Sequence, residues 1–375
     1  MFAAGAGLGR ILVLERRAAV ASLTSAHSAE GFRLEWDAPE NIGMVRDSVE
    51  VFDRFRELIG IPDYDIGLRK QGYLFMSGSA GPTYRPALLG DRVRRWHDLG
   101  LTDVEYLTGD EARRRFPFAG DSVEQAHFRA GDGFVDAGAV ARGLVASGRF
   151  DTFVEAPVAA IQTLGSRVTG VRTAGDRTVA TGTVVVAGGP FTRRLVEAAG
   201  AQLPTENRRR HGLALHLPAG LVDPSWPMVV DADLGLYWRP WPGGIFVGWE
   251  KALPWDQRPS EPMDPVPADF TYLEQVRTHG RRLTSFWGDL RFDQAVWHTG
   301  QYVATEPNDG RPIIGGHPDL SGLYVNTAYE GRGVMASPAG GRLLVRLLLG
   351  DADEGANPFR VFSAERGNEP DQMVL

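Results

Sequence analysis

An acidic residue that directly follows an apolar run is the first position whose type and place could serve chemistry. Residues 11–14 form a short, uninterrupted apolar run, which is typical of a buried parallel strand, and Glu15 comes next. In a dinucleotide-binding unit, a carboxylate at the end of such a strand accepts hydrogen bonds from the two hydroxyls of an adenosine ribose. The alternative is a solvated acid at a strand end, and Glu15 alone does not decide between the two.

The glycines near the N-terminus do not supply the phosphate loop that should accompany such an acid. That loop is expected roughly 20 residues upstream, whereas only fourteen residues precede Glu15. Residues 5–9 superficially match a glycine fingerprint, but they precede a strand and do not open a helix. Because a phosphate needs the amides of a helix N-terminus, we interpret residues 1–9 as the end of a helix that turns into the strand.

A second group of candidates lies near the C-terminus, where a predicted strand leads through glycines into a predicted helix. The strand covers residues 323–326, and the helix covers residues 338–349. Glycines leave backbone amides accessible, and the helix dipole can stabilise negative charge on a bound cofactor. A plain strand–turn–helix connection is the alternative. The candidates in this segment are Gly331, Arg332, Gly333, Val334 and Met335.

Residues 308–315 and 322–342 together resemble the flavin-binding end of the D-amino-acid oxidase family, which includes glycine oxidase and sarcosine oxidase. The resemblance extends over nearly the whole chain. Its other segments are residues 14–17, 24–25, 28–33, 131–136, 157–161 and 186–191. The loop at Phe32 and Arg33 is most similar to the sarcosine-oxidase-like and dehydrogenase branches. The departure is at the front, where the family's first strand and phosphate loop have no counterpart.

The resemblance implies noncovalent FAD as the cofactor and assigns residues to it. Glu15 and Arg16 correspond to the end of the family's second strand, and Thr24 and Ser25 to its flavin-contacting loop. Val158 falls on the strand whose backbone meets adenine. The remaining residues, on the two glycine turns, are Gly188, Gly331, Arg332, Gly333, Val334 and Met335.

The reaction implied by the resemblance is oxidation of a C–N bond in an amine or amino acid, with hydride passing to flavin N5. A substrate carboxylate favours a bidentate arginine, and Arg33 and Arg239 are the candidates. Tyr237 and Trp238 could form a wall of the site, although aromatic residues in strands are often core. Surface or structural ion pairs are the alternative for both arginines.

The electron acceptor is oxygen or another compound, and Lys251 bears on this choice. Related oxidases use a lysine near the flavin to promote reaction with oxygen, and Lys251 follows Trp249 and Glu250 at a suitable position. A solvated lysine beside Glu250 is the alternative. His27 lies in the flavin-contacting loop, but the histidines have no metal-site spacing, so we expect no metal site.

The elements that must position these residues predict an α/β fold. Amphipathic helices are expected at residues 39–58, 85–99 and 109–115, and another helix is expected after an N-cap at Asp136. Strands are expected at residues 73–76, 153–158, 168–173 and 183–187, followed by alternating, antiparallel-type patterns up to residue 300.

This pattern predicts two domains. A discontinuous, Rossmann-like FAD-binding domain comprises residues 1–70, 131–203 and 301–375. An α+β substrate domain with an antiparallel sheet comprises residues 71–130 and 204–300. The second domain is expected to cover the flavin that the first one binds.

Composition limits the class of protein. The 375 residues carry a formal charge of −7 and no long basic run, which argues against nucleic acid as a partner. The chain lacks an apolar stretch long enough to span a membrane, and no secretory signal is visible, so a cytoplasmic location is expected. The absence of cysteine excludes disulfides, thiolate metal sites and a cysteinyl flavin.

Three hypotheses follow from the sequence. The first is an enzyme that acts on a small amine or amino acid. The second is a truncated, catalytically silent relative or a non-catalytic subunit of a flavoprotein assembly, so the oligomeric state stays open. The third is a start codon assigned too late, which would place a strand and a glycine fingerprint in the DNA upstream of Met1. Restoring such residues should then raise FAD affinity, because the loop supplies donors to the pyrophosphate.

Overall fold

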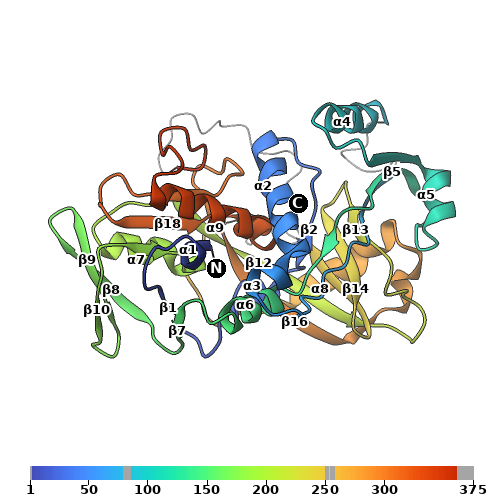
Figure 1. Ribbon diagram of the computed structural model, residues 1–375. Helices are drawn as coiled ribbons and strands as arrows, with labels where there is room; N and C mark the ends of the chain where they lie inside the picture. The colour runs from blue at the N-terminus through green and yellow to red at the C-terminus, as the bar shows by residue number, and fades with distance from the viewer. Residues whose placement is uncertain (1, 79–85, 250–252, 254–257, 361–375) are drawn as a thin grey trace.

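An eight-stranded sheet dominates one half of the molecule. The computed structural model describes residues 2–78, 86–249, 253 and 258–360, and Figure 1 shows this sheet on the right. The strand order is β16-β12-β15-β14-β13-β3-β5-β4, and every pair is antiparallel except β13 with β3. The strands are β3 (Tyr73–Gly78), β4 (Val104–Thr108), β5 (Val123–Arg129), β12 (Thr205–His216), β13 (Met228–Asp231), β14 (Leu236–Trp241), β15 (Gly244–Trp249) and β16 (Arg291–Thr305).

The other half contains smaller sheets with parallel pairs. β11 pairs in parallel with β18, and β1 pairs in parallel with β7. A separate antiparallel sheet has the order β10-β9-β8. The strands are β1 (Leu12–Leu14), β7 (Asp151–Phe153), β8 (Val158–Leu164), β9 (Arg167–Thr173), β10 (Thr178–Ala180), β11 (Val184–Val186), β17 (Ile313–Gly316) and β18 (Leu323–Thr327).

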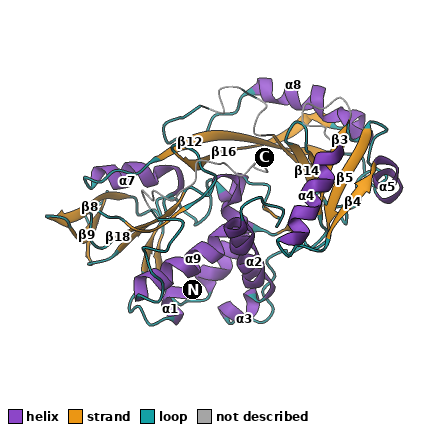
Figure 2. Cartoon of the chain, turned by 90° about the horizontal axis from the view of Figure 1, so that it is seen from above, coloured by secondary structure: helices purple, strands orange, loops and turns teal. Residues whose placement is uncertain are grey.

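Helices α2 and α9 lie side by side between these halves, as both views show (Figures 1 and 2). The Oγ of Ser48 on α2 accepts a hydrogen bond from the amide of Ala339 on α9 at 3.1 Å, so the two helices approach closely. The helices are α1 (Phe2–Gly5), α2 (Pro39–Asp53), α3 (Phe55–Ile59), α4 (Pro86–Asp98), α5 (Gly109–Arg115), α6 (Ala137–Ala146), α7 (Thr192–Ala198), α8 (Phe270–His279) and α9 (Gly333–Leu349).

A small sheet and several 3-10 helices complete the fold. The small sheet has two strands, β2 (Gly31–Phe32) and β6 (Gly133–Phe134). The 3-10 helices are η1 (Ser25–His27), η2 (Gly189–Phe191), η3 (Gly280–Arg282), η4 (Ser285–Asp289) and η5 (Glu330–Arg332). η5 leads directly into α9, so the chain changes direction there before the helix begins.

The structure confirms the predicted α/β class and most expected elements, with three corrections. α9 begins at Gly333, so the helix expected at residues 338–349 starts five residues earlier and contains Pro338. α2 ends at Asp53 and α3 begins at Phe55, so the single helix expected at residues 39–58 is interrupted at Arg54. β7 ends at Phe153 and β8 begins at Val158, so the single strand expected at residues 153–158 is wrong. Glu155 has a positive φ of 52° there, which extended backbone does not tolerate.

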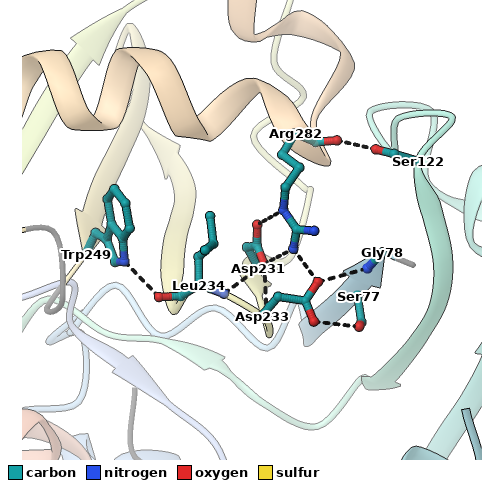
Figure 3. Close-up of polar contacts among 8 residues, drawn as sticks. All are labelled: Ser77, Gly78, Ser122, Asp231, Asp233, Leu234, Trp249 and Arg282. Atoms are coloured by element: carbon teal, nitrogen blue, oxygen red, sulfur yellow. Dashed lines mark hydrogen bonds and ion pairs between the residues drawn. The ribbon is translucent and has the colours of Figure 1, made fainter. Parts of the chain in front are cut away.

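A buried charge network holds the turn after β13 against β3 and η3 (Figure 3). Arg282 forms an ion pair with Asp231 at 2.7 Å and a second one with Asp233. Asp233 also accepts hydrogen bonds from the Oγ of Ser77 at 2.8 Å and from the amide of Gly78 at 2.9 Å. One guanidinium therefore neutralises two carboxylates that are 8% and 0% exposed.

Candidate functional site

The main cavity lies where β2, β12, β14 and β16 approach η1 and the start of α9. It encloses about 900 Å³ including its open mouth. Its lining combines residues of the eight-stranded sheet with residues of η5 and the start of α9. Segments far apart in the sequence therefore meet around one space, as expected for a ligand site between two halves of a protein.

A second cavity lies toward α6, η2 and β18 and encloses about 1080 Å³ including its opening. Both cavities share lining residues on η1, β16 and η5–α9, so they lie next to each other. The shared residues are Thr24, Ser25, Gln301, Tyr302, Glu330, Gly333 and Val334. Together the two cavities offer room for a long ligand.

The turn between β18 and α9 carries backbone strain and unsatisfied polar atoms at the cavity wall. Ala328 and Glu330 have positive φ values of 60° and 53°, a conformation that is costly outside glycine. The Oε1 of Glu330 and the Nη1 of Arg332 are buried without a hydrogen-bond partner among the described residues. Burial raises the pKa of Glu330, against the opposing effect of Arg332. These atoms are therefore suited to contact a bound group.

The predicted residues at the start of α9 meet at this wall. Gly331, Arg332, Gly333, Val334 and Met335 all line the main cavity. The first amides of a helix have no partner within the helix, and its dipole places partial positive charge there. This end of the cavity thus favours an anionic or hydrogen-bond-accepting edge of a ligand.

The part of the lining that comes from the eight-stranded sheet carries a cation and phenols. Nη1 of Arg210 lies 3.5 Å from the hydroxyl of Tyr237, and the Arg210 guanidinium lies 4.8 Å from the centre of the Tyr302 ring. All three residues line the cavity. Tyr237 is on the face of β14 toward the cavity, whereas Trp238 lies in the core on the other face and donates to Thr284, as strand alternation requires. Trp238 therefore forms no part of the wall.

Arg33 also lines the cavity, from a position enclosed by aromatic rings. Its guanidinium lies 3.7 Å from the centre of the Trp36 ring and 5.2 Å from that of Phe75. Nearby, the hydroxyl of Tyr73 faces Gly31 so closely that a Cβ at residue 31 would overlap it. Burial raises the pKa of Tyr73, which keeps its hydroxyl protonated.

Arg239 is engaged elsewhere. Its Nε donates to the carbonyl of Ala29 at 2.7 Å, its Nη1 to the carbonyl of Pro240 at 3.2 Å, and its Nη2 to the carboxylate of Glu30 at 2.7 Å. Burial raises the pKa of Glu30, and the Arg239 charge opposes that effect. Arg239 is not among the residues that line either cavity, so its role as a carboxylate ligand stays a prediction that the geometry does not favour.

The other predicted cofactor residues divide into two groups. Thr24 and Ser25 line both cavities, and the Thr24 hydroxyl donates to the carbonyl of Gln301 at 2.7 Å. The remaining four are not among the lining residues, although Gly188 lies between Ala187 and Gly189, which line the second cavity: Glu15, Arg16, Val158 and Gly188. The carboxylate of Glu15 accepts the amide of Arg17 at 2.8 Å, and Arg16 pairs with Asp264 at 2.7 Å. Lys251 lies outside the described residues.

Sequence reasoning did not single out several residues of the wall. These residues are Glu30, Trp36, Tyr73, Arg210, Met228, Gln301, Tyr302 and Glu330. A signal existed for two of them. Arg210 belongs to three consecutive arginines, residues 208–210, and such a run of charge inside a strand is unusual. Glu330 stands inside the glycine turn that suggested the cofactor site. The others follow from tertiary packing alone.

The described part of the chain offers no cluster of metal ligands and no membrane-spanning helix. No group of three or more histidine, cysteine or acidic side chains there could hold a metal ion. None of the helices in that part is long and apolar enough to cross a membrane.

Comparison with known proteins identifies the family. The model of the FAD dependent oxidoreductase (DAO) family matches residues 1–347. FAD-dependent oxidoreductase domain-containing protein 1 of Xenopus laevis is 23% identical, over 92% of this chain and 74% of the relative. Glycine oxidase from Geobacillus kaustophilus has a TM-score of 0.79 at 21% identity, covering 96% of this chain and 94% of its own.

A second solved structure has the same fold. L-proline dehydrogenase from P. horikoshii has a TM-score of 0.78 at 20% identity, covering 98% of this chain and 92% of its own. At these identities the structural likeness establishes the fold, and the family match along the sequence establishes the membership. The chain belongs to the FAD dependent oxidoreductase (DAO) family.

Proposed function

We propose that the chain is an FAD-dependent oxidoreductase that oxidises a C–N bond of a small amine or amino acid. FAD is the cofactor that the family binds. The observation that carries the proposal is one cavity lined both by the start of α9 and by Arg210 and Tyr237. The first part of this lining suits the cofactor, and the second suits an anionic substrate.

The residues present fit FAD. The two adjacent cavities offer room for a long ligand, and the buried polar atoms of Glu330 and Arg332 that lack partners among the described residues belong to lining residues. We propose that the start of α9 holds the flavin ring noncovalently, and that η1, through Thr24 and Ser25, borders it. When bound, the flavin accepts the electrons and hydrogen removed from the substrate C–N bond.

The chain's own residues bind and orient the substrate. We propose Arg210 as the residue that pairs with a substrate carboxylate, with the Tyr237 hydroxyl as a second donor to the same group. The guanidinium is held against the Tyr302 ring, which limits its motion and lowers the entropic cost of binding. Arg33 is the alternative cation, because it lines the same cavity.

Tyr73 excludes water and donates a hydrogen bond rather than accepting a proton. Its side chain is fully buried apart from the cavity, and burial keeps the hydroxyl protonated. No side chain of the cavity wall is required as a general base, because the cofactor carries the redox chemistry. Binding and orientation are thus the work of the protein.

We propose that the substrate is small and that each half of the molecule binds one of the two ligands. The names of the similar structures include glycine oxidase and L-proline dehydrogenase, which supports a small amino acid or amine here. The eight-stranded sheet forms the substrate domain, and the segments around α9 form the FAD domain. The choice between oxygen and another electron acceptor depends on Lys251 and stays a prediction. The cytoplasmic location is a separate prediction.

Cofactor occupancy tests the first part of this proposal. The purified chain should take up FAD, with visible absorbance that co-elutes with the protein on a desalting column. The bound flavin should then bleach under anaerobic conditions with at least one amine or amino acid. A chain that stays colourless after incubation with FAD would instead support the catalytically silent relative.

A further inference from the structure

A buried pair of carboxyl groups lies behind the cavity wall. Glu35 and Asp132 are both 0% exposed, and Glu35 belongs to the segment after β2 that also carries Arg33 and Trp36. Asp132 belongs to the turn between β5 and β6. The two carboxyls come from distant parts of the chain and meet beneath residues that line the cavity.

The hydrogen bonds to this pair fall on one oxygen. The Oδ1 of Asp132 accepts the amide of Leu34 at 3.2 Å and also the guanidinium of Arg129. The Oδ2 of Asp132 and both side-chain oxygens of Glu35 are buried with no donor among the described residues. Burying an acceptor without a donor is costly, so these three oxygens need an explanation.

A proton held between the two carboxyls would engage two of these three oxygens, one as the donor and the other as the acceptor. Carboxylates accept hydrogen bonds only, so two carboxyl groups bond each other only when one of them is protonated. Burial, reinforced by the neighbouring Glu35 carboxyl, raises the pKa of Asp132 well above its ordinary range. The interaction of Asp132 with Arg129 opposes that shift without cancelling it.

The charged and titratable neighbours of the pair are few. Arg129 is shared with the more exposed Asp103 at 2.9 Å, and the Arg33 side chain donates to the main-chain carbonyl of Glu35. The charges of Arg33, Asp132 and Glu35 act on the Tyr73 hydroxyl, so the pair lies within electrostatic range of a residue that lines the cavity. Burial, assisted by the positive charge of Arg33, lowers the pKa of His127 to about 3, so this ring is neutral.

We propose that Glu35 and Asp132 share one proton, and that this shared proton positions the Arg33–Trp36 segment at the cavity wall. Trp36 contacts two cations of the cavity wall: the guanidinium of Arg33 lies 3.7 Å and that of Arg332 lies 5.0 Å from a Trp36 ring centre. A change in the position of Trp36 therefore affects both arginines. Loss of the proton leaves two adjacent buried carboxylates, whose repulsion separates the segment from the β5–β6 turn. Glu35 and Asp132 are positioning residues, and the inference rests on the cavity being the flavin site.

Infrared spectroscopy of the FAD-loaded chain tests the proton directly. At neutral pH the wild type should show the C=O stretching band of a protonated carboxyl that is missing from both Asp132→Asn and Glu35→Gln. Asp103→Asn is the matched control, because it removes an exposed partner of the same arginine, and it should keep the band. A wild type without this band, or a band that survives in Asp132→Asn, would overturn the shared proton. This readout requires no substrate and is independent of the proposed reaction.

FAD affinity as a function of pH tests the positioning role. At pH values high enough to remove the shared proton, the dissociation constant of the wild type for FAD should rise. The rise should be at most about tenfold per pH unit, as linkage to one proton allows. Asp132→Asn keeps an N–H donor toward Glu35, so its FAD affinity should not change over this range. Asp132→Ala should bind FAD weakly at every pH. The same alkaline loss in wild type and Asp132→Asn would contradict the role, whereas weak binding by all folded forms would point to failure of the cavity assignment instead.

Discussion

At the scale of single residues, two arginines of the same sheet differ in whether they line the cavity. Arg239 and Arg210 both come from the eight-stranded sheet, yet Arg239 gives its nitrogens to Ala29, Pro240 and Glu30. Arg210 lines the cavity beside Tyr237. Both are arginines on strands of the same sheet, so the sequence alone does not say which of them lines the cavity.

Replacing Arg210 tests the proposed carboxylate contact. Arg210→Met should weaken binding of a carboxylate probe such as benzoate by about 10- to 100-fold, because one charge-assisted hydrogen bond contributes roughly 1.5–3 kcal/mol. Perturbation of the flavin spectrum measures the affinity. Arg209→Met removes the same charge from the next residue on β12, which is not among the lining residues, and should leave the affinity unchanged. Equal losses in both variants would argue against a specific contact.

A neutral buried histidine should make the protein sensitive to acid. Burial lowers the pKa of His127 to about 3, and its ring is stacked on Phe75 at 4.5 Å. A lowered folded-state pKa means that stability is complete above the ordinary value of 6.5 and declines as pH falls toward 3. From pH 7 to 5 this group should cost about 2 kcal/mol.

His127→Phe keeps the ring and should remove that part of the acid sensitivity. Urea unfolding at pH 7 and at pH 5 measures the difference in unfolding free energy. The variant should also be at least as stable as the wild type at pH 7, because both ring nitrogens lack hydrogen-bond partners among the described residues. His216→Phe, at an exposed position, serves as the control. An undiminished loss in His127→Phe would show that other groups cause the sensitivity.

At the scale of elements, sequence patterns predicted the strands and helices better than their junctions. The helix after Asp136 begins as expected because the Asp136 carboxylate accepts the amide of Ala139 at 2.6 Å, a local signal. The interruption at Arg54 has no comparable signal, since the apolar spacing continues from α2 into α3. Junctions of this kind depend on tertiary packing, which a single sequence does not display.

Gly248 on β15 should control where Tyr237 lies. The two residues are cross-strand partners, and a Cβ at residue 248 would overlap the Tyr237 ring. Gly248→Ala should therefore move the phenol and weaken benzoate binding by about tenfold, the order expected for one lost hydrogen bond to a charged group. The circular dichroism spectrum should not change. Gly288→Ala, where a Cβ meets nothing within 4 Å, should bind normally. Unchanged affinity in Gly248→Ala would remove Tyr237 from the proposed contact.

The charge network at η3 should stabilise the eight-stranded sheet. Arg282→Met leaves the carboxylates of Asp231 and Asp233 buried without their cation, and should cost about 2–3 kcal/mol after allowance for the partly exposed arginine. Urea unfolding measures the change. Arg281→Met, at the exposed neighbouring residue, should cost far less. Similar costs for both would mean that the network contributes little to stability.

At the scale of the whole molecule, the site depends on bringing distant segments together. The turn before α9 was recognisable in the sequence because strand, glycines and helix are contiguous there. The rest of the lining was only partly recognisable, since Arg33, Tyr73, Arg210 and Tyr302 come from separate segments. The predicted adenosine-side residues illustrate the same limit: Glu15 follows β1 as expected, but it lies apart from the lining of both cavities.

The most direct test of the proposed reaction compares matched pairs of compounds that differ only in a carboxylate. The FAD-loaded chain is mixed under anaerobic conditions with glycine or methylamine, and with L-proline or pyrrolidine, while flavin absorbance is followed. We predict that at least one amino acid bleaches the flavin, and does so faster than its amine counterpart, because Arg210 and Tyr237 bind the carboxylate. An FAD-loaded chain that no amine or amino acid bleaches would contradict oxidation of a C–N bond at this site.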